Sequence, residues 1–322
     1  MKTLSTIQVI ALCQLDGTGA KTVMRICEII KERDIEIDSA KDLHDFLVQA
    51  RSEKAVPRLR EYNESDVSRA FIVAKRIIEE SAATGIHAAS YLDKDYPANF
   101  LKTVDEDGKA SVPVVVYYKG DISITSQPGI AVIGTREPTS EGKRIGKLLS
   151  SKFAERGFNI VSGLAVGCDT FGHLGALSVG GKTTAILAHG LNTIYPPQNE
   201  ELAAQILDNG GLLLSEYPIG TALTTYNLVA RDRLQSGLAN ATLVIQTGKT
   251  GGTMHAVRST LAAQKPLYVI HYQDEATLMS EKTAGNEYLT HKGAKTIVEN
   301  DDIDKIAATI KTFQPIKNDL FD

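Results

Sequence analysis

Apolar residues recur with a helical period of 3.6 through the first 85 residues. The spacing is clearest in Ile7–Leu12, Val23–Ile30 and Val67–Ile78. Gly17 and Gly19 lie between the first two of these segments. That turn resembles the hairpin of a helix–hairpin–helix element, in which glycines let the backbone meet a phosphate chain, and equally an ordinary turn between helices. The pattern predicts a small all-helical domain over residues 1–85, with both interpretations of its first turn open.

From residue 86 onward, short apolar runs alternate with amphipathic segments. Val112–Tyr118 is β-branched and aromatic, which favours a strand. Further strands are predicted at 130–133, 159–162, 183–187, 211–214, 242–246, 267–270 and near 296–298. Helices are predicted at 141–156, 169–179, 199–208, 227–238, 253–264 and 302–312. Alternation with nearly continuous apolar strands is typical of a parallel sheet covered on both faces. We therefore predict an α/β domain over residues 86–322, with a parallel sheet between two layers of helices.

Composition limits the classes of protein that this chain can represent. Its 322 residues carry a formal net charge of −4, and no apolar run approaches the length that spans a membrane. The first residues lack a signal-peptide pattern. Cys13, Cys27 and Cys168 lack metal-ligand spacing, and the histidines are scattered. We expect a cytoplasmic protein with free thiols, without a metal site or a cofactor.

Charge is distributed unevenly along the chain. Residues 136–156 are locally basic, which suits either a nucleic-acid surface or a solvated helix face. Charge alone favours the solvated face. The basic residues there are Arg136, Lys143, Arg144, Lys147, Lys152 and Arg156, against the acidic Glu137, Glu141 and Glu155.

Several familiar nucleotide-binding motifs are missing from the sequence. No Gly-x-Gly-x-x-Gly follows a predicted strand, so a standard dinucleotide fold is unsupported. The Gly-Lys-Thr triplets at 181–183 and 248–250 lack the earlier glycine of a P-loop, where Ala176 and Leu243 stand. The first triplet also leads into a strand instead of a helix. These features argue against an ATPase, and no Gly-x-Ser-x-Gly nucleophile elbow is present.

Small residues gather where the predicted strands end. Gly134-Thr135-Arg136, Ser162-Gly163 and Gly251-Gly252-Thr253 each follow a strand. Carboxyl ends of parallel strands meet at one edge of a sheet, where ligands bind. Backbone amides at a helix start favour phosphate, and arginine adds a planar donor fork. The sequence therefore predicts a broad groove for an extended, phosphate-bearing ligand, although Arg136 could also cap its helix or pair with a nearby glutamate.

For the other polar and aromatic residues near this edge, we expect mainly structural roles. Asp169 is well placed as a helix N-cap, and His173 is expected to pack and to bond Asp169 one turn earlier. Tyr195, Tyr217 and Tyr226 are candidates for stacking on nucleobases. Tyrosine at a strand end more often packs into the core, and we favour that role here.

The order of these segments resembles the DNA-processing protein A family (DprA/Smf). The resemblance covers about residues 90–270, and the helical first domain fits the family's sterile-alpha-motif-like domain more weakly. The matching segments are Asp95-Tyr96-Pro97, Tyr118-Lys119-Gly120, Ile133-Gly134-Thr135-Arg136, Ser162-Gly163-Leu164-Ala165 through Asp169 and His173, Gly181-Lys182-Thr183, Tyr195-Pro196, Leu214-Ser215-Glu216, Arg231-Asp232-Arg233 and Thr250-Gly251-Gly252-Thr253.

The resemblance implies single-stranded DNA binding without catalysis and loading of the RecA recombinase, as in natural transformation. It also implies an extended Rossmann-like fold for residues 86–322 and a homodimer formed through that domain. The lack of a membrane-spanning apolar run predicts no membrane association. Phosphate contacts of this kind give salt-dependent affinity. By motif match the DNA contacts would be Arg136, Gly163, Lys182, Asn199, Arg231, Arg233 and Thr253, and the strand-end loops add Gly134, Thr135, Ser162, Gly251 and Gly252.

The chain departs from the family pattern at several positions. Asp232 stands where asparagine is usual, so it either positions Arg231 and Arg233 through an ion pair or weakens phosphate binding. Val166 occupies a place often held by arginine, and Gly252–His255 replaces a Ser-Leu-Ile-Thr-like run. The chain ends soon after the fold. We therefore expect a divergent member without the winged-helix domain that many members carry.

Two alternatives remain open, a Rossmann-like sensor and a hydrolase of a small nucleotide. Related proteins of the lysine-decarboxylase-like class hydrolyse nucleotides and carry a Gly-Gly-x-Gly-Thr-x-x-Glu signature. Here Ala256 stands where that glutamate is needed, so hydrolysis would require Glu216 or Asp169 in its place. A sensor would use the same groove. Near the end of the chain, Lys317–Phe321 vaguely resembles a sliding-clamp-binding peptide, but we expect a frayed polar C-terminus.

Overall fold

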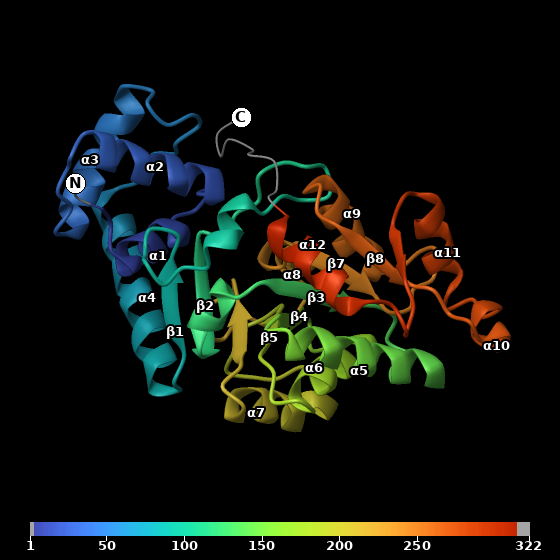
Figure 1. Cartoon of the computed structure of the whole chain (residues 1–322). Coiled ribbons are helices and arrows are strands. Elements are labelled where there is room, and N and C mark those ends of the chain that lie inside the picture. Colours follow the sequence, from blue (N-terminus) through green and yellow to red (C-terminus); the bar gives the residue numbers. More distant parts are fainter. Residues whose placement is uncertain (1–2, 314–322) are drawn as a thin grey trace. The chain divides into compact units, whose positions relative to one another are not determined.

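The structure, a computed structural model, describes residues 3–313 (Figure 1). The segment Lys317–Phe321 lies outside these residues. The chain divides into two compact units. Among the described residues, the first unit contains residues 3–96 together with Pro113–Tyr117 and Glu216–Ile219, and the second contains the others up to residue 313. No helix within residues 3–313 is long and apolar enough to cross a membrane.

The first unit is mainly helical, as the periodicity predicts. Its third helix was not singled out from the sequence. Two helices begin with reciprocal capping boxes, in which Ser39 pairs with Asp42 and Asn63 pairs with Asp66. The elements are α1 (Thr6–Gln14), α2 (Ala20–Glu32), α3 (Ala40–Ser52), α4 (Glu64–Ala83) and β1 (His87–Ser90).

In the turn between α1 and α2, the side chain of Arg60 packs against Gly17. Gly17 has a φ of +83°, which favours glycine. A Cβ atom at Gly17 would lie 2.5 Å from Arg60 Nε. The guanidinium of Arg60 also pairs with Asp16, and the hydroxyl of Tyr62 donates to the Asp16 carbonyl at 2.8 Å. The glycine face that a helix–hairpin–helix element would offer to a phosphate chain is thus in contact with Arg60.

The second unit is built on a parallel sheet, and the predicted fold class is confirmed. Seven of its strands follow the order β6-β5-β4-β3-β7-β8-β9. The chain order reverses between β3 and β7, and Ile130 pairs with both Ile160 of β4 and Ala241 of β7. The seven strands are β3 (Gly129–Ile133), β4 (Asn159–Ser162), β5 (Thr183–Leu187), β6 (Leu212–Ser215), β7 (Ala241–Val244), β8 (Leu267–Ile270) and β9 (Lys295–Ile297). A further strand, β2 (Val115–Gly120), has its first residues in the first unit and its last residues in the second.

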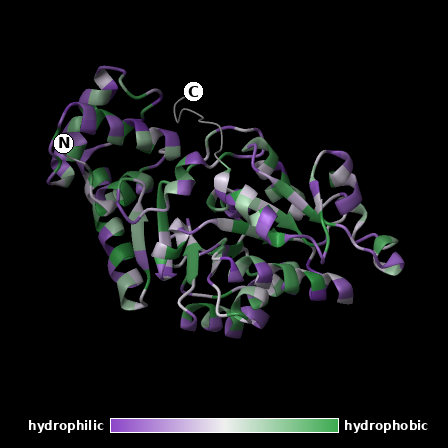
Figure 2. Cartoon of the chain, in the orientation of Figure 1, coloured by the Kyte–Doolittle hydropathy of each residue, from purple (hydrophilic) through white to green (hydrophobic). Residues whose placement is uncertain are grey.

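Helices cover both faces of this sheet. Alternate residues of one strand point to opposite faces, so Val132 belongs to the core cluster that includes residues of α5, α6 and α12, whereas Ile133 belongs to the cluster that includes residues of α9 and α11. Figure 2 shows hydrophobic strands inside and hydrophilic outer helix faces. The helices are α5 (Ser140–Glu155), α6 (Cys168–Leu177), α7 (Glu200–Asp208), α8 (Thr225–Leu238), α9 (Thr253–Ala262), α10 (Glu275–Leu278), α11 (Ala284–His291) and α12 (Ile303–Thr312), with short 3₁₀ turns at Ala98–Lys102, Ile122–Ser126 and Pro197–Asn199.

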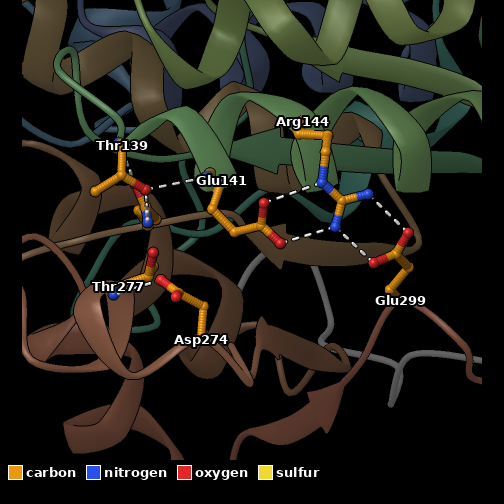
Figure 3. A network of polar contacts seen from close by, with 8 residues as sticks. Thr139, Glu141, Arg144, Asp274, Thr277 and Glu299 are labelled. Carbon is orange, nitrogen blue, oxygen red and sulfur yellow. Dashed lines mark hydrogen bonds and ion pairs between the residues drawn. The ribbon is translucent and has the colours of Figure 1, made fainter.

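Much of the positive charge on α5 is paired within the unit. Figure 3 shows the guanidinium of Arg144 between the carboxylates of Glu141 and Glu299, and its nitrogen atoms lie 2.6–2.9 Å from them. Arg156 pairs with Asp304 at 2.7 Å. The ammonium group of Lys152 donates to the Glu299 carbonyl at 2.7 Å. The partners of these three cations all lie in the same unit, which agrees with the interpretation of this segment as a solvated helix face.

A glutamine clamp joins the end of β7 to the start of α5. The side chain of Gln246 accepts from the Thr139 amide at 2.8 Å and donates to its hydroxyl at 2.9 Å. That hydroxyl also caps the helix by accepting from the Gly142 amide at 3.0 Å. A Cβ atom at Gly142 would collide with the carboxamide of Gln246. The clamp therefore requires a glycine in the first turn of α5.

This requirement predicts coupling between positions 142 and 246. We expect Gly142→Ala to destabilise the protein by about 1–3 kcal/mol, because a methyl group would be forced into a packed contact. In a Gln246→Ala background the same change should cost nothing, or stabilise by up to about 1 kcal/mol, because alanine is the better helix former. Urea unfolding of the four proteins of this cycle measures the coupling. An equal loss in both backgrounds would contradict the clamp.

Candidate nucleic-acid interface

A cleft of about 500 Å³ opens at the carboxyl ends of β3 and β7. This is the point where the strand order reverses, the usual ligand position in an open α/β sheet. The cleft brings together seven of the residues predicted from sequence. They are Gly134, Thr135, Arg136, Arg231, Gly251, Gly252 and Thr253.

The loop after β3 is held by its backbone. A Cβ atom at Gly134 would lie 2.5 Å from Cys168 Sγ, so only glycine fits there. The Thr135 amide donates to the Gln246 carbonyl at 2.7 Å, and the Thr135 carbonyl accepts from the Cys168 amide at 3.0 Å. Arg136 follows, is exposed, and makes no hydrogen bond or ion pair with any residue in 3–313. Its guanidinium is therefore a free donor fork on a fixed loop.

The opposite wall of the cleft is the start of α9. No side chain caps this helix, and a Cβ atom on Gly251 or Gly252 would meet open space. Within the described part of the chain, the amides of Gly251, Gly252 and Thr253 donate to no acceptor. Unpaired amides at a helix N-terminus attract anions. The two walls thus offer donors to one negatively charged group.

Arg231 lies beneath the cleft and is only 5% exposed. Its Nη1 atom donates to the Gly163 carbonyl at 2.8 Å and also to the Ile186 carbonyl. Its Nε atom lies 3.1 Å from Asp232 Oδ1. A Cβ atom at Gly163 would lie 2.6 Å from Arg231 Cζ, so this glycine makes room for the guanidinium. Arg231 joins the ends of β4 and β5 to α8 and does not project freely into the cleft.

Asp169 is a buried carboxylate beside Arg231. It accepts from the amides of Gly163 at 3.0 Å and Ala165 at 3.3 Å. Burial raises the pKa of Asp169 to about 6, although Arg231 and the two amides oppose that shift. The expectation that Asp169 caps α6 is wrong, because the N-cap is Gly167 and Asp169 lies within the first turn.

His173 is packed as expected but has a different partner. Its Nδ1 atom lies 2.7 Å from Thr183 Oγ1, so the predicted bond to Asp169 is wrong. The side chain is fully buried, and burial lowers the pKa of His173 to about 3. A neutral imidazole therefore spans α6 and β5 and has no access to a ligand.

A second, smaller recess of about 50 Å³ adjoins the cleft. It shares Arg136, Ala165 and Arg231 with the cleft, and it adds Gly163 and an apolar wall. Tyr195 lines it and is 44% exposed, while Tyr226 is 78% exposed. The expectation that these tyrosines pack into the core is therefore wrong. The wall consists of Leu187, Tyr195, Pro196, Leu223 and Leu228.

Four of the residues predicted from sequence lie elsewhere. Ser162 is buried and its hydroxyl donates to the Val132 carbonyl at 2.6 Å. Asn199 is buried and braces the 163–170 loop by donating to the Leu164 carbonyl at 2.8 Å. Lys182 precedes β5, so it lies at the amino-end edge, where it donates to the Asn209 carbonyl at 2.6 Å. Arg233 turns toward Ser111, with Nε 2.8 Å from its hydroxyl.

Sequence reasoning missed four residues of the cleft. Gln235 lies one helical turn after Arg231, and that spacing was the available signal. Thr247 and Gly248 follow β7 and belong to the same rim. Glu137 also lines the cleft, and its carboxylate lies 3.7 Å from Lys282 Nζ. Lys282 lies between α10 and α11, two helices that the sequence analysis did not predict.

The sequence is similar to a known protein family and to several of its members. The sequence model described as DNA recombination-mediator protein A matches residues 87–308. Protein Smf from Synechocystis sp. is 34% identical over 215 residues, covering 66% of this chain and 51% of its own length. Protein Smf from Escherichia coli is 32% identical over 208 residues, covering 65% and 53%. The chain therefore spans about half the length of these curated relatives.

Solved structures show the same architecture. DNA processing protein A from Streptococcus pneumoniae is similar with a TM-score of 0.71 and 24% identity, over 92% of this chain and 95% of that one. DNA processing protein A from Helicobacter pylori is similar with a TM-score of 0.58 and 27% identity, over 71% and 97%. The Helicobacter pylori structure concerns the single-stranded DNA binding mode of that protein.

Two glycines of the site should differ sharply in how well they tolerate substitution by alanine. We expect Gly163→Ala to destabilise the protein by about 1–3 kcal/mol, because its Cβ would displace Arg231 and Gln235. Gly252→Ala is the matched control and should change stability by less than about 0.5 kcal/mol, since its helical backbone faces open space. Chemical denaturation of both variants measures the difference. Equal losses would mean that Gly163 does not make room for the guanidinium.

The raised pKa of Asp169 predicts a pH-dependent stability. A carboxyl that holds its proton more strongly in the folded state stabilises the protein at low pH and loses that contribution as pH rises. The free energy of unfolding of wild type relative to Asp169→Asn should therefore fall by up to about 3 kcal/mol between pH 4 and pH 7. Denaturation across that range tests this, with the exposed Asp208→Asn as control. Parallel curves for wild type and Asp169→Asn would contradict it.

Proposed function

The chain belongs to the DNA recombination-mediator protein A family, and from this premise we propose that it binds single-stranded DNA and acts as a recombination mediator. In this role it holds the strand without catalysing a reaction on it. It loads the RecA recombinase in natural transformation, and it works in the cytoplasm as a homodimer.

One observation carries the proposal. The unpaired guanidinium of Arg136 faces the same cleft as the unpaired amides of Gly251, Gly252 and Thr253. Donors of this kind bind phosphate oxygens without reading sequence. The exposed Tyr195, which lines the adjoining recess, offers a surface on which a base can stack. Phosphate donors beside an aromatic surface suit a single strand better than a duplex, whose bases are already stacked.

We place the contacts with DNA around the two hollows. They are Gly134, Thr135, Arg136, Gly163, Arg231, Gly251, Gly252 and Thr253. Ser162 and Asn199 act indirectly, because their side chains fix the loop that carries Gly163. Lys182 and Arg233 do not belong to this set, since each donates to groups away from the cleft.

The alternatives are a small-nucleotide hydrolase and a small-nucleotide sensor. The hydrolase is disfavoured because Ala256 lines the cleft where the related class carries its glutamate. Asp169 does not replace it, since its carboxylate is buried and accepts from two backbone amides. A sensor would bind mononucleotide in preference to long single strands, which a competition experiment distinguishes.

Removing the guanidinium of Arg136 should weaken binding of single-stranded DNA. We expect Arg136→Ala to lower affinity for a labelled oligothymidylate about tenfold, through loss of a charge-assisted hydrogen bond. The slope of log affinity against log salt should fall by about 1. Fluorescence anisotropy at several salt concentrations measures both quantities, with duplex and mononucleotide as competitors.

Lys182→Ala is the matched control, because it removes the same charge from the opposite edge of the sheet. It should retain the affinity and the salt slope of wild type. An equal loss in the two variants would place the strand elsewhere on the protein. If only mononucleotide competes with the labelled strand, or if no DNA binds, the mediator function would be rejected in favour of the small-nucleotide sensor.

A further inference from the structure

The positive charges of α5 divide into two groups. The three cations described above are paired with groups that follow β9 or lie in α12, as Figure 3 shows for Arg144. Lys143 and Lys147 are exposed, and their ammonium groups make no hydrogen bond or ion pair with any residue in 3–313. The ammonium of Lys143 lies 5.8 Å from the centre of the Phe171 ring, a contact that leaves its N–H groups available to an acceptor.

The positions of these two lysines are unfavourable for the helix itself. Lys143 lies in the first turn of α5, where the helix dipole repels positive charge. Lys147 follows one turn later, and like charges at this spacing repel each other. The neighbouring helix α6 carries a single acidic residue, Asp169, and that residue is buried, so α6 offers no exposed carboxylate to offset these costs. Proteins break such local rules mainly at functional or strained sites.

The helix face that carries the two lysines continues from the cleft. A Cβ atom at Gly167 would lie 2.5 Å from the carbonyl of Arg136, so the loop that bears Arg136 rests on the start of α6. Further along, a Cβ atom at Gly175 would lie 2.4 Å from the carbonyl of Lys147. The two helices are therefore in close contact from the cleft to Lys147, and Figure 1 shows them side by side. Three unpaired cations follow one another along this boundary.

A row of cations that begins at a phosphate site suits a chain of phosphates. Lys143 and Lys147 are about 6 Å apart along the helix axis, which is close to the spacing of successive phosphates in an extended strand. An ammonium group binds phosphate as a point charge without a fixed geometry, so it accommodates a flexible backbone.

We propose that a single strand held in the cleft leaves it past Arg136 and continues over α5, where Lys143 and Lys147 bind its next phosphates. We call these two residues the lysine track. The inference rests on the proposed function and extends its site from the cleft to a helix face.

Strand length separates the lysine track from the cleft. Wild type and the double variant Lys143→Ala/Lys147→Ala are titrated with labelled oligothymidylates of about 4, 8 and 16 nucleotides, lengths that bracket the usual site sizes of single-strand binding domains. The shortest strand should occupy the cleft alone, whereas the longest should also reach the track. Fluorescence anisotropy at several salt concentrations gives the affinity and its salt dependence for each strand.

We expect the double variant to bind the longest strand about tenfold more weakly, because two exposed ion pairs with phosphate are lost. The slope of log affinity against log salt should fall by about 1–2. Both differences should shrink as the strand shortens and vanish at about four nucleotides. Because both lysines are exposed, a thermal melt should show that the variant folds as wild type does.

The matched control is Lys292→Ala/Lys295→Ala. These two lysines are also exposed, and their ammonium groups lie 5.7 Å from the centre of the Tyr288 ring and 5.8 Å from that of Tyr268. Lys295 begins β9, which runs parallel to β8, so the pair lies near the amino-end edge of the sheet, away from the cleft. The control removes the same charge and should keep the affinity and salt slope of wild type for every strand.

The outcomes separate this inference from the proposed function. A loss that grows with strand length in the double variant, and not in its control, supports the lysine track. Unchanged binding of the longest strand overturns the track even if Arg136→Ala weakens binding, and would leave the two lysines to an acidic protein partner. A loss that is the same at every length, or the same in the control, also overturns it. If wild type binds no strand, the proposed function and the track both fail.

Discussion

A buried guanidinium is the interaction on which the cleft depends. Arg231 gives up its hydration inside the second unit, and that loss must be offset by close partners. Two strand-end carbonyls and the carboxylate of Asp232 supply them. The buried guanidinium also constrains its neighbours. Gly163 must lack a side chain to leave room for it, and Asp169 lies close enough to act as a second carboxylate. An arginine that appears in sequence to be a DNA ligand is thus first a structural joint between α8 and the ends of β4 and β5.

The sheet was largely predictable because its signals are local. Buried parallel strands have continuous apolar runs, and the strands at 159–162, 183–187 and 267–270 were placed at the residues where the structure has them. The helices that escaped prediction are different in kind. α10 and α11 are short, with four and eight residues, so a period of 3.6 has little room to show. α3 begins with a capping box that could have marked it.

The cleft was partly predictable for a geometric reason. Loops after parallel strands share one edge, which brought the Gly134–Arg136 and Gly251–Thr253 loops together. Lys182 precedes its strand, and the same rule places it at the other edge. Arg231 and Arg233 differ by two residues on α8, so they point to different sides of the helix. Whether a charged group is paired depends on partners distant in sequence, and this is why the paired and unpaired cations of α5 could not be told apart beforehand.

The strand order also determines when the cleft comes into existence during synthesis. Strands β3 to β6 leave the ribosome consecutively, and each finds its neighbour in the strand just made. The second neighbour of β3 is β7, and the wall opposite Arg136 comes only with the start of α9. Pairing across such a long stretch of chain is slow, because the loop must close before the contacts form. The loop that carries Arg136 is itself held by the Gln246 carbonyl. A nascent chain therefore cannot complete either wall of the cleft until β7, Gln246 and the start of α9 have emerged.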